Sequence, residues 1–287
     1  MRLRRLVPAL VLAGSTVATS FAHEPLWGET PTIFGPGVFH PEIRLGYMHP
    51  GDTRIFEQEY GLQYGINRLV NVRLVLPGVR MDFDQSDGSA GGESRVGGIG
   101  DAVLSAKYRF HLRQDTGMQS SQALVFGWKA PTGDDERDGP DGSRLMPAEQ
   151  PGTGSHGLEL GYAVDHERLV DSAWLSVFYL HEFARGLRRG DQVELDAAYG
   201  RWIARPNVAD DLGVNLAFGM HAEAAASDQL DDGLSAGNRH QMIGLHVTPI
   251  VTRGRSQYRA GLLVPVWKGG DREAAGLEVR AGWEIFF

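Results

Sequence analysis

Apolar and polar residues alternate along most of the chain beyond residue 37, and this period of two predicts β-strands. The alternation is clearest at Val70–Leu76, Leu104–Phe110, Leu212–Phe218 and Leu277–Trp283. In each segment one face is apolar, and the other carries mainly charged, glycine or small side chains. The segments are roughly 10–13 residues long, near the length that a tilted strand needs to cross a bilayer.

About twelve such segments can be counted, which predicts an all-β fold, a transmembrane antiparallel up-and-down β-barrel of about 12 strands. A soluble sandwich would show the same alternation, but the even strand number and the connections favour the barrel. The three long connections, 81–98, 132–155 and 222–238, follow odd-numbered strands and would therefore lie at one end. The predicted strands are 38–48, 54–66, 69–80, 99–110, 121–131, 156–165, 172–183, 191–203, 211–221, 239–250, 256–267 and 276–287.

The two ends of the chain indicate export to an outer membrane. Three arginines near the start precede the apolar run Leu6–Ala13, and Ser20–Ala22 forms a small-x-small cleavage site. We therefore predict a signal peptide at 1–22. The segment 23–37 is rich in Pro and Gly and has no pattern; it is either a periplasmic N-terminal extension or a partial plug. The barrel would then span 38–287.

The last predicted strand is short and amphipathic and closes on an aromatic residue, as the last strands of outer-membrane barrels typically do. Trp283, Ile285 and Phe287 are on one phase, and we expect them to act as the assembly signal for the barrel-assembly machinery. Both termini would then lie in the periplasm, with the protein in the cell outer membrane.

Charge and composition exclude several other classes. The net charge is −8, and removal of three signal arginines would lower it to about −11, so a nucleic-acid partner is not expected. The chain has no cysteine, which excludes disulfides and thiolate metal sites. Nothing in the sequence predicts a cofactor.

The polar phase of the strands supplies the candidate pore-lining residues. Salt bridges among them could fill a narrow, closed barrel, or rows of opposite charge could create a transverse field across an open pore. The sequence leaves both alternatives open. The candidates are Glu57, Glu59, Arg73, Lys107, Arg109, Lys129, Glu159, Glu194, Asp196, Arg280 and Glu284.

The long connections are strongly acidic, above all at Asp134, Asp135, Glu136 and Asp138. They match no calcium-loop motif. They are expected either to bridge lipopolysaccharide phosphates through divalent ions or to attract cations to the mouth.

Histidine and serine positions give little evidence for chemistry. His221 and His240 flank a long connection almost symmetrically and would face each other in a hairpin of simple register, which makes them weak candidates for a metal site. Ser155 and His156 are adjacent, so strand alternation would send them to opposite faces and prevent a nucleophile–base pair. We therefore expect no metal and no enzyme activity.

Two short motifs resemble a known family. Gly98-Ile99-Gly100-Asp101 leads into Ser105–Phe110, and Trp128–Asp134 follows on the next strand. Together they resemble the outer-membrane transporter family named after the meta-pathway of phenol degradation. The resemblance implies a β-barrel that passes small organic molecules, and it brings no catalytic residues. Gly98 and Gly100 would permit a bulge, and Asp101 would bond locally in a turn.

These observations predict a channel or transporter for small solutes, including aromatic or other small organic compounds, with passive or weakly selective passage. Two alternatives remain: a plugged structural or envelope-binding barrel, and a membrane-embedded hydrolase. An open lumen would separate the first two, and convergent Ser, His and Asp side chains at one rim would indicate the third.

Overall fold

The computed structural model describes residues 25–49, 53–83, 94–138, 144, 150–183, 189–206, 212–229, 235–237, 239–270 and 276–287. Within them the regular structure is entirely β, and they contain no helix long and apolar enough to cross a membrane. The predicted signal peptide, 1–22, lies outside the described residues. The strands are β1 (Phe39–Met48), β2 (Thr53–Gly65), β3 (Val70–Phe83), β4 (Ser94–Ile99), β5 (Val103–Asp115), β6 (Met118–Lys129), β7 (His156–Arg168), β8 (Asp171–Phe183), β9 (Gln192–Ala204), β10 (Leu212–Ala225), β11 (Asp228–Gln229), β12 (Ser235–Gly237), β13 (His240–Arg253), β14 (Ser256–Gly270) and β15 (Glu278–Ile285).

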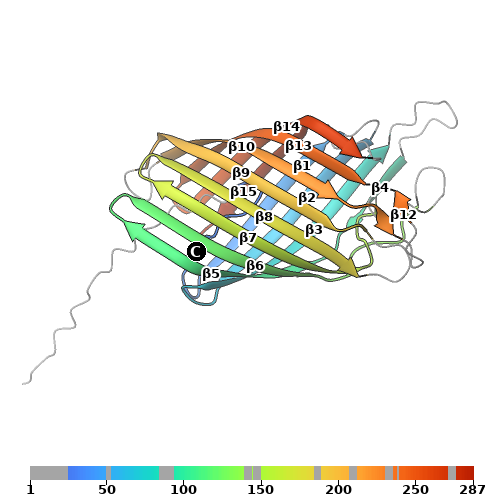
Figure 1. Ribbon diagram of the computed structural model, residues 1–287, viewed down its shortest axis with the longest axis horizontal. Coiled ribbons are helices and arrows are strands. Elements are labelled where there is room, and N and C mark those ends of the chain that lie inside the picture. The colour runs from blue at the N-terminus through green and yellow to red at the C-terminus, as the bar shows by residue number, and fades with distance from the viewer. Residues whose placement is uncertain are drawn as a thin grey trace, which may run out of the picture.

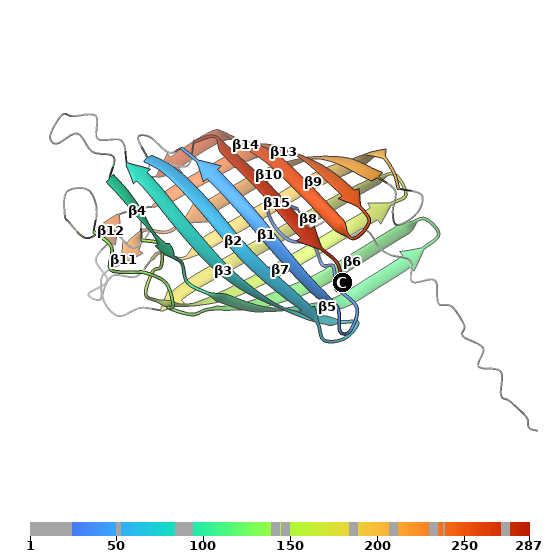
Figure 2. The same cartoon turned by 180° about the vertical axis from the view of Figure 1, so that it is seen from behind.

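Twelve long strands close into one antiparallel barrel, so the predicted fold is confirmed (Figures 1 and 2). Each strand pairs with its neighbour in the chain, β1 pairs with β15, and the β2–β3 pairing completes the ring. A closed ring leaves no long unpaired edge, which a bilayer would not tolerate. The short strands β11 and β12 form a separate hairpin between β10 and β13.

The predicted strand 99–110 is in fact interrupted. β4 pairs with the C-terminal part of β3 (Gly78–Phe83), and β5 pairs with its N-terminal part (Val70–Val75). Residues 100–102 separate β4 from β5. Ile99 lies opposite Gly78 and Val103 opposite Val75, so three residues of one strand face two of the other. The bulge inferred from Gly98 and Gly100 therefore lies at the family motif.

The tight turns that the structure describes lie together at one end of the barrel. The turns 66–69, 116–117, 169–170 and 254–255 lie at the same end as the C-terminus. Gly117 and Gly254 have φ of 74° and 59°, a left-handed conformation that suits glycine in tight turns. The other end holds the strand ends that flank the three long connections, as the sequence predicted: Phe83 and Ser94, Lys129 and His156, and Ala225 and His240.

The barrel is apolar outside and polar inside. Outward side chains such as Leu74, Tyr108, Phe126 and Phe218 are 40–56% exposed, whereas inward Lys107 is 5% exposed. An apolar surface of this kind around the whole ring is suited to contact with lipid. The outward aromatic residues include Tyr60, Phe110, Trp128, Trp267 and Trp283.

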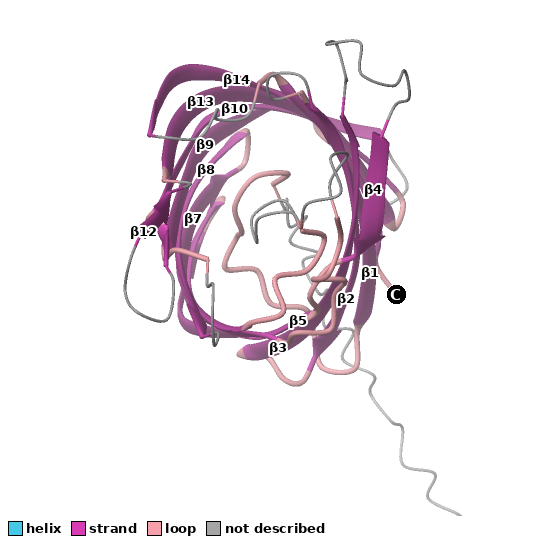
Figure 3. Cartoon of the chain, turned by 90° about the vertical axis from the view of Figure 1, so that its right-hand side faces the viewer, coloured by secondary structure: helices cyan, strands magenta, loops and turns pink. Residues whose placement is uncertain are grey.

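Residues 25–30 of the segment 23–37 lie inside the ring of strands. Residues 25–30 hydrogen-bond or pack against inward side chains of β3, β5, β8, β13 and β14. Figure 3, which looks along the barrel, shows loop segments within the ring. The candidate functional site therefore consists of the inner wall together with this segment.

Candidate functional site

Two apolar side chains anchor the N-terminal segment in the lumen. Leu26 and Trp27 are almost fully buried and pack with Met242 of β13 and Leu263 of β14. The Trp27 ring lies 4.9 Å from the ring of His246, and its six-membered part is close to Gly261, where an added β-carbon would come within 2.5 Å. The absence of a side chain at that glycine leaves the space that the indole occupies. This small apolar cluster was not predicted, because the inner face was expected to be polar.

Glu29 then holds the segment to the opposite wall. Its carboxylate accepts a hydrogen bond from Arg73 Nη1 at 2.7 Å and lies 3.0 Å from Lys107 Nζ. Lys107 also donates to the carbonyl oxygen of Thr30 at 2.8 Å. On the other side, the backbone N–H of Glu29 donates to Ser176 Oγ at 3.2 Å. The segment is therefore bonded to β3, β5 and β8 at once.

The carboxylate of Glu42 on β1 pairs with three arginines of the inner wall. Its carboxylate lies 2.5 Å from Arg44 Nε, 2.6 Å from Arg259 Nη2 and 3.1 Å from Arg73 Nη2. Arg259 also lies 3.2 Å from Glu284 of β15 and donates to the carbonyl oxygen of Pro25. Buried charges are stable only when they are paired in this way. The network ties the wall to the start of the segment.

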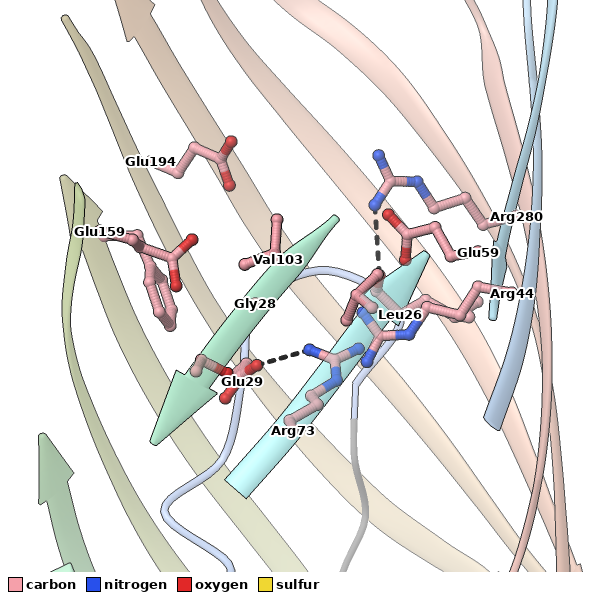
Figure 4. A pocket seen from close by; sticks show the side chains of 13 residues that line it. Leu26, Gly28, Glu29, Arg44, Glu59, Arg73, Val103, Glu159, Glu194 and Arg280 are labelled. Atoms are coloured by element: carbon pink, nitrogen blue, oxygen red, sulfur yellow. Dashed lines mark hydrogen bonds and ion pairs between the residues drawn. The ribbon is translucent and has the colours of Figure 1, made fainter. Parts of the chain in front are cut away.

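A cavity of about 260 Å³ remains beside the segment (Figure 4). Arg44, Arg73 and Arg280 line it from β1, β3 and β15, and Glu159 and Glu194 line it from β7 and β9. Its other lining residues are Leu26, Gly28, Glu29, Glu59, Val75, Val103, Ser105 and Phe178. The cavity arginines thus come from one side of the ring, and the two charged residues of the other side, Glu159 and Glu194, are both acidic.

The structure places the sequence-predicted lumen residues on the inner wall, and it divides them into two groups. Glu59, Arg73, Glu159, Glu194 and Arg280 border the cavity. The other predicted residues contact neighbours elsewhere on the inner wall. The structure therefore contains both salt bridges within the wall and a cavity whose arginines lie on one side. Glu57 lies over Gly46, Lys107 bonds Thr30, Arg109 donates to the carbonyl oxygen of Arg68, Lys129 pairs with Glu182, Asp196 pairs with His221, and Glu284 pairs with Arg259. Whether solutes pass along these residues stays a prediction.

The family motif is an anchor for the long connection 130–155. The Asp101 carboxylate accepts hydrogen bonds from the backbone N–H groups of Gly133 at 3.0 Å and Thr153 at 2.7 Å. Lys129 pairs with Glu182 and lies 3.5 Å from Asp101. The expectation of a local turn bond at Asp101 was wrong, because the carboxylate bonds residues more than thirty positions away. It therefore fixes both ends of this connection at the rim.

The two candidate metal-binding histidines do not face each other. His221 lies opposite Gly244 and His240 opposite Ala225, so the simple register assumed from the sequence was wrong. His221 Nδ1 lies 2.7 Å from Asp196, and His240 Nε2 lies 2.8 Å from Glu223. Among the described residues no group of three or more His, Asp or Glu side chains is arranged to hold a metal.

The adjacent Ser155 and His156 lie in different environments. Ser155 is buried and donates to Glu182, whereas the exposed His156 ring stacks on Trp128 at 5.8 Å. The two side chains therefore do not form a hydrogen-bonded nucleophile and base.

The acidic cluster at 134–138 is partly neutralised within the loop. Arg137 donates to Asp134 at 2.9 Å, and this bond, with one from the backbone N–H of Ile99, lowers the pKa of Asp134 below its ordinary value. Asp135, Glu136 and Asp138 are at least partly exposed. At the chain end, Trp283 and Phe287 are exposed at 38% and 63%, and Ile285 is half-buried; their role in assembly stays a prediction.

Several residues of the site were not named from the sequence. Arg44, Glu42 and Arg259 lie on the polar phase of predicted strands, and a systematic inspection of that phase could have found them. Glu29 lies in a segment without periodicity, so no local signal predicts its position. Phe178 lies on a strand whose two faces both carry large apolar residues, so alternation alone does not assign its side chain to the inner face.

The closed ring, the exposed apolar outer face and the charged inner face define an outer-membrane type of β-barrel with a partly filled lumen. Residues 43–201 match the family described as "Putative MetA-pathway of phenol degradation", and the chain belongs to this family. The resemblance inferred from the two motifs is thereby confirmed.

Solved structures share the fold. An outer membrane channel from Pseudomonas putida F1 is 14% identical, with a TM-score of 0.69 over 88% of this chain and 97% of that chain. The NanC porin is 8% identical, with a TM-score of 0.47 over 85% of this chain and 98% of that chain. No curated protein sequence matches the chain.

Proposed function

We propose that this protein is an outer-membrane channel for small solutes, passive or weakly selective, with a lumen narrowed by its own N-terminal segment. The apolar outer face supports a bilayer location, and the short turns beside the C-terminus support periplasmic termini, since outer-membrane barrels keep their short turns on that side. The family description supports small organic solutes, aromatic compounds included, as cargo.

The observation that carries this proposal is the charged cavity beside the segment. A barrel with a purely structural interior would be filled by packed or paired side chains. Here about 260 Å³ remains unfilled inside the ring, bordered by three arginines on one side and by Glu159 and Glu194 on the other. A small solute would bind in such a cavity during its passage between the two ends of the barrel.

One observation favours the alternative, a plugged structural or envelope-binding barrel. The segment is fixed by Arg73, Lys107 and the Leu26–Trp27 anchor, and these contacts would have to loosen before anything larger than the cavity could pass. The proposal therefore includes movement of the segment, and the alternative does not.

Solute uptake distinguishes the two. The refolded full-length protein would be placed in liposomes, and swelling would be followed with small neutral, cationic and anionic organic solutes. We expect swelling above that of protein-free liposomes. Protein that is fully folded, as judged by heat-modifiable migration, but supports no swelling would contradict the channel and favour the plugged barrel.

The proposal also assigns the partners. The outward apolar belt would contact outer-membrane lipid, the acidic loops would contact lipopolysaccharide through divalent ions, and the last strand would be recognised by the barrel-assembly machinery. Removal of divalent ions with a chelator should weaken binding of purified lipopolysaccharide to the protein in detergent.

A further inference from the structure

The arginines that line the cavity are already matched by carboxylates of their own wall. Arg44 and Arg73 pair with Glu42, and Arg73 also pairs with Glu29. Arg280 pairs with Glu278 on its own strand. Their positive charge is therefore largely compensated before any solute arrives.

The two acids of the opposite wall have no such close partner, although Arg73 attracts Glu159, and Arg280 and His221 attract Glu194, from beyond ion-pair distance. Within the described part of the chain, neither Glu159 nor Glu194 has a hydrogen-bond or ion-pair partner, and both line the cavity. The Glu159 carboxylate lies against Gly127, 2.9 Å from where a β-carbon would stand there. An ionised carboxylate that is partly removed from water and unpaired is costly. A cation in the cavity would remove that cost.

An aromatic ring lies on the strand between these two acids. Phe178 of β8 lies opposite Glu194 in the β8–β9 pairing and opposite Gly161 in the β7–β8 pairing. Its ring covers Gly161, at 2.3 Å from an added β-carbon, so the ring lies along the wall towards β7, the strand that carries Glu159. Carboxylates beside an aromatic face are the surroundings in which proteins bind ammonium groups.

The rest of the lining has room for an apolar body. Leu26, Val75 and Val103 border the same cavity. A bare metal ion would gain nothing from these side chains, whereas an organic cation could bury carbon atoms against them.

We propose that this cavity is a binding site for a small organic ammonium ion, with its charged nitrogen at Glu159, Phe178 and Glu194 and its apolar part against Leu26, Val75 and Val103. The inference deepens the proposed channel function by naming a solute class, and it rests on that function only for the role of the bound ion as cargo. Binding itself does not require transport.

The test is calorimetry on the full-length protein in a non-ionic detergent. Benzylammonium is the probe, and benzyl alcohol and benzoate have the same ring without the positive charge. We expect benzylammonium to bind at least tenfold more tightly than either. Equal binding of benzyl alcohol, or tighter binding of benzoate, would overturn the proposal without any mutation.

Variants then locate the site. The double substitution Glu159→Gln with Glu194→Gln should weaken benzylammonium binding at least tenfold, and Phe178→Leu should weaken it about two- to fivefold. Glu136→Gln, which removes one carboxylate from the exposed outer loop, is the matched control and should leave binding unchanged. Unchanged affinity in the double variant would overturn the proposal. If the double variant does not fold, the two single variants carry the same test, each with a smaller loss.

The outcome can be separated from that of the channel proposal. Binding without solute uptake would refute the channel and leave the ammonium site standing. Uptake without ammonium-selective binding would refute the site and leave the channel standing.

Discussion

Arg73 Nη1 lies 2.7 Å from Glu29 Oε1, so an arginine of the barrel wall directly holds a carboxylate of the N-terminal segment. The same arginine reaches Glu42 with its other terminal nitrogen, at 3.1 Å. The ion pair therefore joins the internal segment to the charge network of the wall. A substitution at either residue of this pair should therefore change how tightly the N-terminal segment is held inside the lumen.

The path of the segment depends on Gly28. Its φ is +75°, and an added β-carbon would come within 2.5 Å of Ser176 Oγ and 2.6 Å of the Asp196 β-carbon. Gly28→Ala should therefore displace the segment, with a backbone cost alone of about 1–2 kcal/mol. Since the chain has no cysteine, a single Leu26→Cys substitution can report the displacement through its rate of labelling by a water-soluble maleimide.

Gly37→Ala is the matched control for that experiment. Gly37 has a similar φ of +82°, but an added β-carbon there meets nothing within 4 Å. It carries the backbone strain without the collision inside the barrel. We expect a clear rise in Leu26→Cys labelling with Gly28→Ala and little with Gly37→Ala. Equal labelling in both would show that the collision does not position the segment.

Neighbouring residues should report opposite surroundings in a bilayer. Arg73 and Lys107 face the lumen, while Leu74 and Tyr108 are 40% and 44% exposed on the outer face. Spin labels at the first pair should be quenched mainly by water-soluble reagents, and labels at the second pair by lipid-soluble ones. The reversed pattern would be incompatible with a barrel that spans the membrane in this orientation.

The rim anchor at Asp101 should contribute to stability. Asp101→Asn weakens its acceptance of the Gly133 and Thr153 N–H groups and removes a charge beside Lys129. Hydrogen bonds to charged groups contribute about 1.5–3 kcal/mol, so we expect a loss within that range in urea unfolding. Asp115→Asn, at the exposed end of β5 on the other side of the barrel, should cost far less. A loss at Asp101 no larger than at Asp115 would rule out an anchoring role.

Ion preference should depend on salt. The exposed acids of the 134–138 loop should give weak cation selectivity at low ionic strength. The selectivity should decrease as salt is added, because the Debye screening length falls to roughly 8–10 Å at physiological salt. Because the pKa of Asp134 is lowered by Arg137, its charge persists as the pH falls through the usual aspartate range. Neutralising Asp134, Asp135, Glu136 and Asp138 should abolish only the salt-dependent part, as measured by reversal potentials. Anion preference at low salt would contradict this expectation.

The sequence predicted the barrel because alternation is a local property that lipid outside and charge inside both enforce. Arg73 and Leu74 show this alternation directly, because they are adjacent in sequence, the charged Arg73 faces the lumen and the apolar Leu74 faces outward. The bulge after Ile99 was inferred from glycines, but the partners of Asp101 were not, because they lie in a distant connection. Register across a long loop is equally non-local, and for that reason the His221–His240 pairing failed.

The interior site was only half predictable for the same reason. The polar phase identified Glu159, Glu194 and Arg280, but it could not show which charges pair. Glu29 and Leu26 enter the site from a segment without periodicity, and their position is determined by complementarity with the wall. Phe178 lies on the inner face, against Gly161 and opposite Glu194, and alternation alone does not determine that placement.

Single-channel recording of the full-length protein in 1 M KCl tests the account most directly. We expect small, brief openings in the wild type. Glu29→Gln, which leaves Arg73 and Lys107 without their charged partner on the segment, should lengthen the open time about tenfold, equivalent to about 1.4 kcal/mol. Glu136→Gln should behave as the wild type at this salt. If wild type and Glu29→Gln are both fully folded and both silent, the segment is a permanent plug and the channel proposal is wrong.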